Sequence, residues 1–329
     1  MNLRAFKQWG FQLLLGFLTL GFVVACQGSS LTGSEDRVVE HCTPVDHAAG
    51  ATCVPEAFER LVTLDSVAFE CAIALGLNPV GTVQSDYQAL LEPLQTEAKN
   101  IGKQGEPSLE QVLTIQPDLI AGLAFNEAQY GQLSKIAPTL LFEFEYSGQW
   151  KTVFHEVATA LGQATAADSV MADYYARAAD FQAQMGDELK DFQVSVVRLY
   201  PDTISLYLKD SFAGTVLQDA GLARPPSQTL GAAAAVQRFG NPIQVQISRE
   251  QIAQADGDVI FLWTGDNTAE ERQRSQEQLL QLQQDPIWQQ LKAVQTGRVY
   301  VVPGYWIGNG PIAANAILDD LFNYLVEGS

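Results

Sequence analysis

The sequence predicts an α/β protein of two lobes joined by one long rigid helix. Three observations predict it. Short apolar runs alternate with helical patterns from residue 60 onward, the alternation comes in two sets, and an unbroken helical pattern lies between the sets. The chain has 329 residues, 47% of them hydrophobic and 17% charged, which is enough for two hydrophobic cores. This composition excludes disorder and a small disulfide scaffold.

The net charge is strongly negative. The chain carries 38 Asp and Glu against 19 Lys and Arg, for a formal charge of -19. Nucleic-acid surfaces need clustered Lys and Arg to neutralise phosphates, so we exclude nucleic acid as a partner.

The N-terminus has the pattern of an export signal. Arg4 and Lys7 precede an apolar stretch over 13–25, which ends in Val-Val-Ala before Cys26. The stretch is shorter than the roughly 20 apolar residues that a membrane-spanning helix needs. It resembles a lipoprotein signal peptide, and we favour lipidation of Cys26, with ordinary cleavage nearby as the alternative. The expected location is periplasmic, with a lipid anchor.

Residues 26–56 are expected to form a tether that contains a disulfide. Cys42 and Cys53 lie close enough in the sequence to close a short loop in an oxidising compartment, which stabilises the fold by roughly 3 kcal/mol in the chain-entropy model. A zinc site that adds His41 and His47 is the weaker alternative, because the spacings match no common zinc module.

The two sets of elements define the lobes. The first lobe is expected over 57–162, with strands at 60–64, 79–83, 118–121 and 139–142 and helices at 67–75, from 108 and at 128–136. The second is expected over 191–329, with strands at 194–199, 204–208, 258–263 and 298–302 and helices at 213–220 and 312–325.

The segment between the lobes, 163–190, reads as one helix. Small or apolar residues recur every three or four positions, at Val170, Tyr174, Ala178, Phe181, Met185 and Leu189. A helix over 166–189 is about 36 Å long, enough to reach from one lobe to the other. It contains no proline and one glycine, so we expect it to limit hinge motion.

An internal repeat relates the lobes. Ser-Leu-Glu-Gln-Val at 108–112, followed by Pro-Asp-Leu-Ile at 117–120, recurs 140 residues later as Ser-Arg-Glu-Gln-Ile and Gly-Asp-Val-Ile. In each copy a helix-capping serine starts a short helix that leads through Asp into a buried strand. Capping and strand-start chemistry explain Ser and Asp, but not a Glu and a Gln in register. The repeat predicts a pseudo-symmetric molecule that docks on a pseudo-symmetric partner, with Glu110 and Glu250 in matching positions.

The sequence contains no recognised catalytic constellation. We find no nucleophile elbow, no P-loop, no complete dinucleotide-binding glycine motif and no zinc-protease motif. His155 falls in a helical pattern, which is more typical of a structural residue than of a base. The sequence therefore favours a binding protein over an enzyme.

Candidate ligand contacts follow the ends of predicted strands. Ligands of open α/β sheets bind at carboxyl ends, so residues there are candidates, although core packing is the alternative for each aromatic and salt bridging for each cation. The aromatic and amide candidates are Phe125, Asn126, Tyr146, Trp150, Trp263, Tyr305 and Trp306. The cations, which suit an anionic ligand, are Arg198, Lys209 and Arg238.

Several longer motifs resemble a known family. The segments 252–262, 286–294 and 297–302, together with Pro-Asp-Leu-Ile at 117–120 and Ile-Ala-Pro-Thr at 136–139, are similar to the ferric-siderophore-binding proteins of ABC importers. The resemblance spans roughly residues 37 to 326. It implies two α/β lobes on one long helix with a ligand cleft between them. It also implies that Glu110 and Glu250 dock into arginine pockets of a dimeric permease.

The resemblance implies a function and leaves the ligand class open. It implies a monomer that captures Fe³⁺ as a siderophore or citrate chelate, with no intrinsic cofactor, and delivers it to a permease in the inner membrane. Hydroxamate-binding relatives tend to place Arg and Tyr where this chain has Gln104 and Asn126, whereas Trp306 matches the family's aromatic wall. The alternatives are a haem or cobalamin carrier, for which His155 is the candidate axial ligand, and a metal-ion receptor or enzyme that uses His41 and His47.

Overall fold

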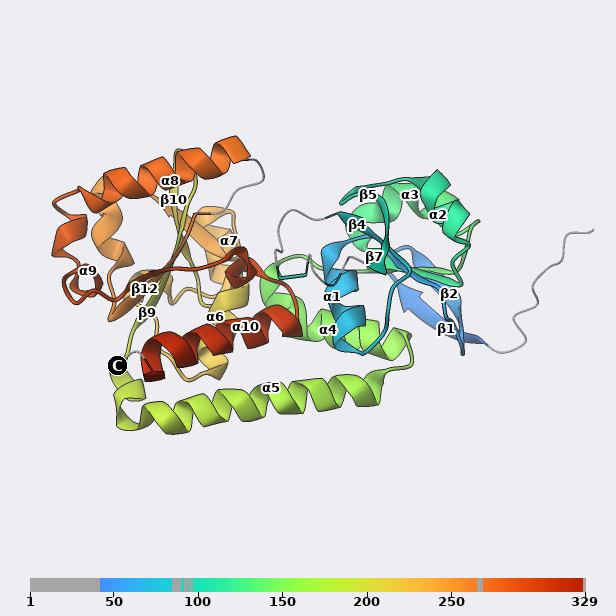
Figure 1. Cartoon of the computed structure of the whole chain (residues 1–329), viewed down its shortest axis with the longest axis horizontal. Helices are drawn as coiled ribbons and strands as arrows, with labels where there is room; N and C mark the ends of the chain where they lie inside the picture. The colour runs from blue at the N-terminus through green and yellow to red at the C-terminus, as the bar shows by residue number, and fades with distance from the viewer. Residues whose placement is uncertain (1–41, 85–89, 92–93, 95–96, 265–268, 328–329) are drawn as a thin grey trace, which may run out of the picture. The chain divides into compact units, whose positions relative to one another are not determined.

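The computed structural model describes residues 42–84, 90–91, 94, 97–264 and 269–327 (Figure 1). The predicted signal peptide, Cys26 and His41 lie outside the described residues. Within them the chain forms a two-stranded hairpin, a six-stranded sheet and a five-stranded sheet. The two larger sheets, each covered by helices, are the two lobes that the sequence predicts.

The N-terminal lobe is built on the six-stranded sheet, in the order β6-β5-β4-β3-β7-β8. All neighbouring strands are parallel except the β5–β6 pair. Its strands are β3 (Leu61–Thr63), β4 (Gly81–Gln84), β5 (Lys99–Lys103), β6 (Glu106–Pro107), β7 (Leu119–Leu123) and β8 (Thr139–Phe142), and its helices are α1 (Ser66–Ala74), α2 (Leu109–Ile115), α3 (Glu127–Leu133) and α4 (Trp150–Ala160). Strands β5 and β6 were not predicted, since β5 reads Lys-Asn-Ile-Gly-Lys and lacks an apolar run, whereas α4 lies where the pattern around His155 predicted a helix.

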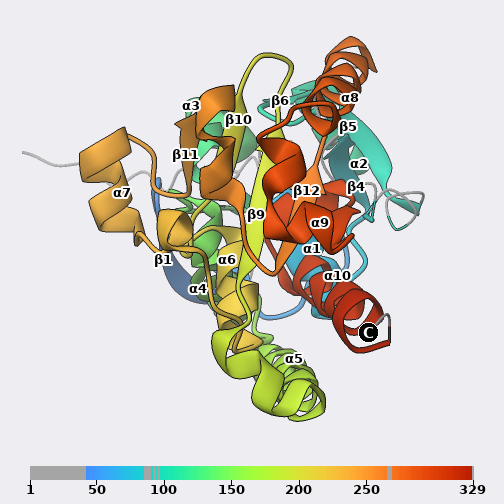
Figure 2. The same cartoon turned by 90° about the vertical axis from the view of Figure 1, so that its left-hand side faces the viewer.

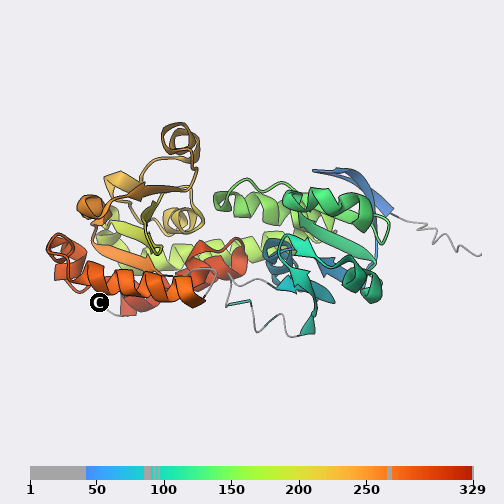
Figure 3. The ribbon, with the colours of Figure 1, turned by 90° about the horizontal axis from the view of Figure 1, so that it is seen from above.

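The C-terminal lobe is built on the five-stranded sheet, in the order β11-β10-β9-β12-β13. Its strands are β9 (Val194–Leu199), β10 (Ile204–Tyr207), β11 (Gln244–Ile247), β12 (Val259–Trp263) and β13 (Val299–Val301), and its helices are α6 (Phe212–Asp219), α7 (Ala232–Phe239), α8 (Ala269–Gln283), α9 (Lys292–Gln295) and α10 (Pro311–Leu321). Figure 2 shows α7 beyond the β11 edge of this sheet, and Figure 3 shows α7 and α8 on opposite sides of the lobe. Strand β10 is antiparallel to both of its neighbours.

The N-terminal hairpin carries the predicted disulfide. Strands β1 (Cys42–His47) and β2 (Gly50–Pro55) pair in antiparallel register with Cys42 opposite Pro55, and Cys42 is bonded to Cys53. The disulfide is the pair that the sequence predicts, but the hairpin is not, because the segment lacks a clean alternation. Thr52 ties the hairpin to the lobe by donating a hydrogen bond to the carbonyl oxygen of Thr139 at 2.9 Å.

The long helix is α5 (Ala164–Met185), which a 3-10 turn, η4 (Gly186–Asp191), extends to the second lobe. Its buried residues are Ala167, Met171, Tyr174, Ala178, Phe181 and Met185, which follow the predicted spacing of three and four. Gly186 ends the helix with φ at +56°, a left-handed conformation that glycine adopts at low cost. Helix α5 packs along α4 and α10, one from each lobe (Figure 1).

One hydrophobic core passes through both lobes. It includes residues of β7 and α4 from the first lobe, of α5, and of β12, α6 and α10 from the second. At the junction the indole nitrogen of Trp150 donates to Thr215 at 2.9 Å, and its ring meets those of Tyr174 and Phe212 edge-on. Asp219 accepts hydrogen bonds from Lys151 and, at 2.7 Å, from Tyr174. Because these contacts join α4, α5 and α6, the lobes share a well-packed junction.

A buried carboxyl group also joins the lobes. Glu70 on α1 accepts a hydrogen bond from the backbone N–H of Ala313, in the first turn of α10, at 2.8 Å. A Cβ at Gly310 would lie 2.6 Å from the Glu70 carboxyl carbon, so only glycine allows this approach. Burial raises the pKa of Glu70 to about 7, despite hydrogen bonds from the backbone of Ala313 and Ile312.

Candidate functional site

The repeated Asp residues play the same structural role in both lobes. Asp118 donates its N–H to the carbonyl oxygen of Arg60, and its carboxylate accepts the N–H groups of Glu59 and Arg60 at 3.2 and 3.1 Å. Asp258 donates its N–H to the carbonyl oxygen of Gln193, and its carboxylate accepts the Gln193 N–H at 2.7 Å. Each Asp thus clamps the start of the neighbouring strand, which confirms that the two lobes are built alike.

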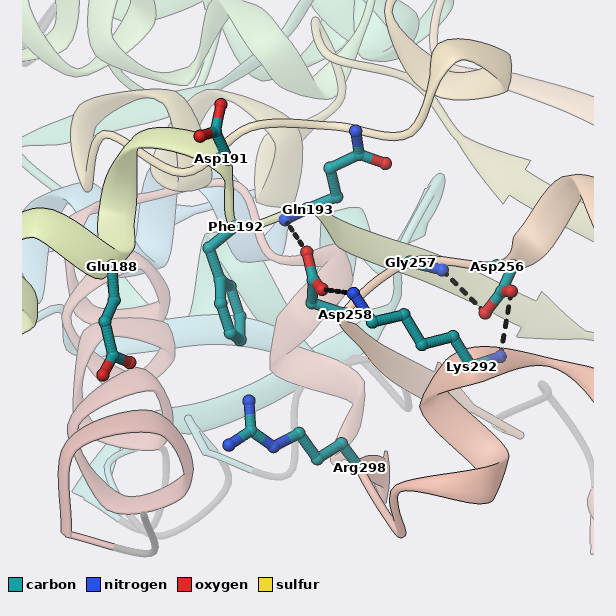
Figure 4. Close-up of a pocket in the computed structure, with 9 residues that line it drawn as sticks. All are labelled: Glu188, Asp191, Phe192, Gln193, Asp256, Gly257, Asp258, Lys292 and Arg298. Atoms are coloured by element: carbon teal, nitrogen blue, oxygen red, sulfur yellow. Dashed lines mark hydrogen bonds and ion pairs between the residues drawn. The ribbon is translucent and has the colours of Figure 1, made fainter.

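A hollow of about 670 Å³ surrounds the second clamp (Figure 4). It lies at the amino ends of β9 and β12, where Lys292 pairs with Asp258, and Asp256 accepts the N–H groups of Lys292 and Gly257 at 2.9 Å. The hydrogen bond to Gln193 and the ion pair to Lys292 keep the pKa of Asp258 low, although burial opposes this. These carboxylates hold the starts of β9 and β12 together.

Both repeated serines are helix caps, and Gln251 adds a side-chain cap in the second copy. Ser108 starts α2, and its hydroxyl oxygen accepts the N–H of Gln111 at 3.3 Å. Ser248 starts the 3-10 helix η6 (Arg249–Ala255), where Gln251 completes a capping box by accepting the Ser248 N–H at 3.0 Å. The second repeated segment is therefore 3-10, not α-helical. Capping explains both serines and Gln251, but it does not explain the side chains of Gln111, Glu110 and Glu250.

Glu110 and Glu250 are exposed residues in the first turn of α2 and η6. Strand β11, which leads into η6, is parallel to β9 because β10 is antiparallel to both. Glu250 therefore lies at the carboxyl-end edge of its sheet. Helix α2 begins beside β5, where the N–H of Ser108 donates to the carbonyl oxygen of Ile101 at 2.6 Å. A hydrogen bond from its own backbone N–H, followed by one from Ser248, lowers the pKa of Glu250.

Of the three predicted cations, Arg198 has a guanidinium group that neighbouring aromatic side chains hold in place. Its guanidinium carbon lies 3.9 Å from the ring centroids of both Tyr200 and Trp263, and one guanidinium nitrogen donates to the Tyr207 hydroxyl at 3.3 Å. Arg198 and Trp263 are directly opposite each other in the β9–β12 ladder, at the carboxyl ends of both strands. They are 9% and 8% exposed. Stacked rings hold the guanidinium in one orientation, which suits recognition of a carboxylate or phosphate.

Lys209 lies elsewhere in the lobe. Because β10 is antiparallel to β9, Lys209 follows the end of β10 away from Arg198, so the carboxyl-end argument that selected it was wrong. A Cβ at Gly231 would lie 3.2 Å from its side chain. The adjoining Asp210 accepts the N–H of Ala232, in the first turn of α7, at 2.7 Å.

Tyr146 belongs to the junction between the lobes. Its pKa is raised, chiefly by burial and then by the charges of Asp210 and Glu145. Gly148, which follows two residues later, is needed there, since a Cβ at that position would lie 2.0 Å from the carbonyl oxygen of Asp210. Tyr146 and Lys209 therefore lie on either side of Asp210.

The remaining N-terminal candidates gather near the start of α1. Gln104 accepts hydrogen bonds from the N–H and, at 3.1 Å, the hydroxyl of Ser66. Asp65, which caps α1, accepts the N–H of Leu123 at 2.7 Å, and burial raises its pKa to about 6. Past Leu123, Phe125 is 51% exposed, whereas Asn126 is fully buried.

Three predicted contacts are wrong as surface residues, because the structure buries Trp150, Asn126 and Trp306, whereas Tyr305 is partly buried. Trp150 is fully buried at the junction of the lobes, and Asn126 donates its amide to the carbonyl oxygen of Leu123. Trp306 is 1% exposed and stacks on Phe261 at 4.3 Å, while its indole nitrogen and the Tyr305 hydroxyl both donate to Asp320. Tryptophan and tyrosine fill a core as readily as they line a pocket. Burial in the fold decides between the two.

Arg238 is exposed in the last turn of α7, next to the exposed side chains of Val236 and Phe239. Its guanidinium carbon lies 5.1 Å from the centroid of the Phe239 ring. The sequence interpretation missed Tyr200 and Tyr207, the partners of Arg198. Tyr200 could have been found from its place two residues after Arg198, because alternate residues of an extended chain share a face.

Most ligands of the alternative zinc site are engaged with other groups in the structure. The Cys42 and Cys53 thiols are joined to each other. His47 uses one ring nitrogen with the Thr52 hydroxyl and accepts the Ala49 N–H with the other. Among the described residues no three His, Cys, Asp or Glu side chains are grouped as metal ligands. His155 is half-exposed on α4, with one ring nitrogen 4.0 Å from the Asp168 carboxylate.

The described helices do not include one with both the length and the apolar character that crossing a membrane requires. The fold and the Arg198 group together define a two-lobed ligand-binding protein. Residues 61–305 match the family described as periplasmic binding protein, and the chain belongs to this family.

Two curated relatives match over most of their length. The chain is 32% identical over 326 residues to the probable siderophore-binding lipoprotein YfiY of Bacillus subtilis (strain 168), covering 96% of this chain and 98% of that one. It is 27% identical to the Fe(3+)-citrate-binding protein YfmC of the same organism, covering 83% and 80%.

A solved structure shares the fold. The crystal structure of Staphylococcus aureus SirA complexed with staphyloferrin B is 28% identical, with a TM-score of 0.73, and the match covers 86% of this chain and 98% of that chain.

Proposed function

We propose that this protein is the extracytoplasmic substrate-binding component of an ABC importer, which captures an anionic ferric chelate, either a ferric siderophore or ferric citrate. Relatives named for siderophore and Fe³⁺-citrate binding support this class. The observation that carries the anionic preference is Arg198, an oriented guanidinium in a chain of net charge -19. Such a chain repels a free anion unless local cations attract it.

The chelator, not the protein, coordinates the iron in this proposal. Arg198 binds carboxylate or phenolate oxygens of the chelate, and Tyr200 and Trp263 add apolar contact. We propose Gln104 and Phe125 as further contacts from the N-terminal lobe, while Tyr146, Lys209 and Arg238 stay candidates that lie apart from the Arg198 group. The protein then works by binding alone, without a resident cofactor and as a monomer.

Delivery rests on the two exposed glutamates. We propose that Glu110 and Glu250 each insert into a basic pocket of one permease subunit, since the two lobes present them in equivalent turns. The shared core keeps their spacing constant. We also propose that a lipid on Cys26 holds the protein at the membrane, which raises its effective concentration at the permease.

The ligand class is tested by tryptophan fluorescence of the mature protein. The panel is ferric citrate, ferric hydroxamates, ferric catecholates, haem, cobalamin and free Fe³⁺. We expect saturable quenching by an anionic ferric chelate and loss of most of the signal in Trp263→Phe, but not in the matched buried control Trp306→Phe. Saturation only by haem, cobalamin or free Fe³⁺, or by no member of the panel, would contradict the proposal.

A further inference from the structure

A second hollow adjoins Glu250. It has a volume of about 530 Å³ and is lined by the start of β10, the end of β11, the first turn of η6 and one face of α8. The lining side chains that carry the argument are Asp202, Thr203, Arg249, Glu250, Gln278 and Gln281. Because Glu250 lies on its rim, the hollow is continuous with the proposed docking surface.

The cations around this hollow are already neutralised. Arg249 pairs with Asp285 at 2.6 Å and also donates to the carbonyl oxygen of Gln281. Arg274, on α8, donates to both carboxylate oxygens of Asp202 at 2.8 Å. Each pair has a net charge of zero, so neither pair balances the negative charge of the Glu250 carboxylate. The rim therefore attracts a positive group.

The polar lining offers acceptors. The buried side-chain oxygen of Gln278 makes no hydrogen bond within the described part of the chain. A buried acceptor without a partner is costly, and a donor supplied by a binding partner removes that cost. A guanidinium carries five N–H donors and no acceptor, which matches a hollow with a carboxylate rim and amide oxygens.

The N-terminal docking surface differs. In α2, Leu113 lies one turn after Glu110 and is 59% exposed. The C-terminal lobe has Ala253 at the matching position of the repeat. The two lobes therefore present an equivalent glutamate with unequal surroundings.

We infer that the hollow beside Glu250 is a second receptor element of the docking surface, and that it takes an arginine side chain of the permease. This inference rests on the proposed function. It gives the C-terminal lobe two charged contacts with the permease. Glu250 inserts into the permease, and one basic side chain of the permease inserts into the hollow. A lobe-specific contact of this kind sets a single orientation of the protein on its partner.

The first test uses the purified protein and L-argininamide as the probe, followed by backbone amide chemical shifts. We expect saturable shifts at Thr203, Gln278 and Gln281 that disappear in Gln278→Lys, which places a positive charge in the hollow. They should persist in Gln273→Lys, a matched change at an exposed position on the same helix. Shifts that avoid the hollow, or that survive Gln278→Lys, contradict the inference.

The second test is iron uptake in the source organism with its own gene replaced by each variant. Gln278→Lys and Thr203→Lys should each lower uptake at least about fivefold with chelate affinity unchanged, whereas Gln273→Lys should behave as wild type. Unchanged affinity shows that each variant is folded. Normal uptake by both hollow variants, in a strain where Glu250→Ala lowers it, overturns the inference alone. Normal uptake by Glu110→Ala/Glu250→Ala overturns the docking proposal itself.

Discussion

At the residue scale, Arg198 is the residue that we propose selects an anionic ligand in this acidic chain. The aromatic rings of Tyr200 and Trp263 fix its plane, and the Tyr207 hydroxyl takes one of its donors. Little conformational freedom remains to be lost when an anion binds. Lysine could supply the charge at this place, but not the planar fork or the stacking.

Substitution of Arg198 tests its role. We expect Arg198→Gln to weaken affinity for the ferric chelate identified in the panel by at least about tenfold, or about 1.4 kcal/mol. Arg198→Lys should recover only part of the loss, because an ammonium group does not stack or bind in a bidentate manner. Isothermal titration calorimetry measures both. Arg298→Gln, an equal loss of charge at the opposite edge of the sheet, is the control and should bind like wild type.

Glu70 predicts a residue-specific pH dependence of stability. Its pKa rises from 4.5 unfolded to about 7 folded, so its contribution to stability is complete below about pH 4.5 and is lost as the pH rises to about 7. The loss is about 3 kcal/mol. Glu70→Gln keeps the acceptor for Ala313 but cannot ionise. In urea unfolding, the unfolding free energy of the variant relative to that of wild type should therefore increase as the pH rises through this window.

The control for Glu70 is Glu156→Gln, an exposed substitution on α4. Its unfolding free energy should follow that of wild type at every pH. A stability difference between Glu70→Gln and wild type that stays constant from pH 4.5 to 7.5 would show that the buried carboxyl does not titrate as described.

At the element scale, the sequence predicted strands and helices with strong periodicity and missed those without it. The first and last residues of β8 and β9 are those that the sequence predicts, and the buried face of α5 follows the predicted spacing. Helix α8 has the sequence Ala-Glu-Glu-Arg-Gln-Arg and little apolar pattern, while β10 gave no sign of its antiparallel direction. Strand direction depends on tertiary pairing, and that error is the reason why Lys209 was misplaced.

The capping box of η6 carries a prediction at this scale. Ser248→Ala removes the side-chain acceptor at the start of the segment and should lower the unfolding free energy by about 1 kcal/mol. It also removes a hydrogen bond to Glu250. We therefore expect reduced uptake, with chelate affinity unchanged, from a protein that is only slightly less stable. Thr229→Ala, at another surface turn, serves as the control, and an equal loss of uptake there would contradict a specific effect of the cap.

At the scale of the whole molecule, the repeat was the most informative part of the sequence. Its Asp and Ser residues have structural roles in both copies and Gln251 caps η6, whereas both glutamates are exposed, which supports the proposal that they face a partner. The ligand site was less predictable. Arg198 and Trp263 lie at strand ends as expected and keep 9% and 8% exposure, whereas Trp150 and Trp306 are at most 1% exposed. The local sequence does not show this difference, because it depends on the packing of distant elements.

The shared core makes the molecule one docking unit. Trp150, Asp219 and Glu70 connect elements of both lobes and α5, so ligand binding at the cleft need not change the distance between the two glutamates. We therefore propose that the two steps use separate surfaces. The Arg198 group binds the ferric chelate, and Glu110 and Glu250 dock the protein on the permease.

The measurement that tests this separation most directly compares chelate affinity and iron uptake for Glu110→Ala/Glu250→Ala. The account predicts wild-type affinity in the purified protein and loss of nearly all uptake in cells that depend on it. Each single variant should retain part of the uptake. Lost affinity would place the glutamates in ligand binding, and normal uptake with normal affinity would show that delivery uses another surface.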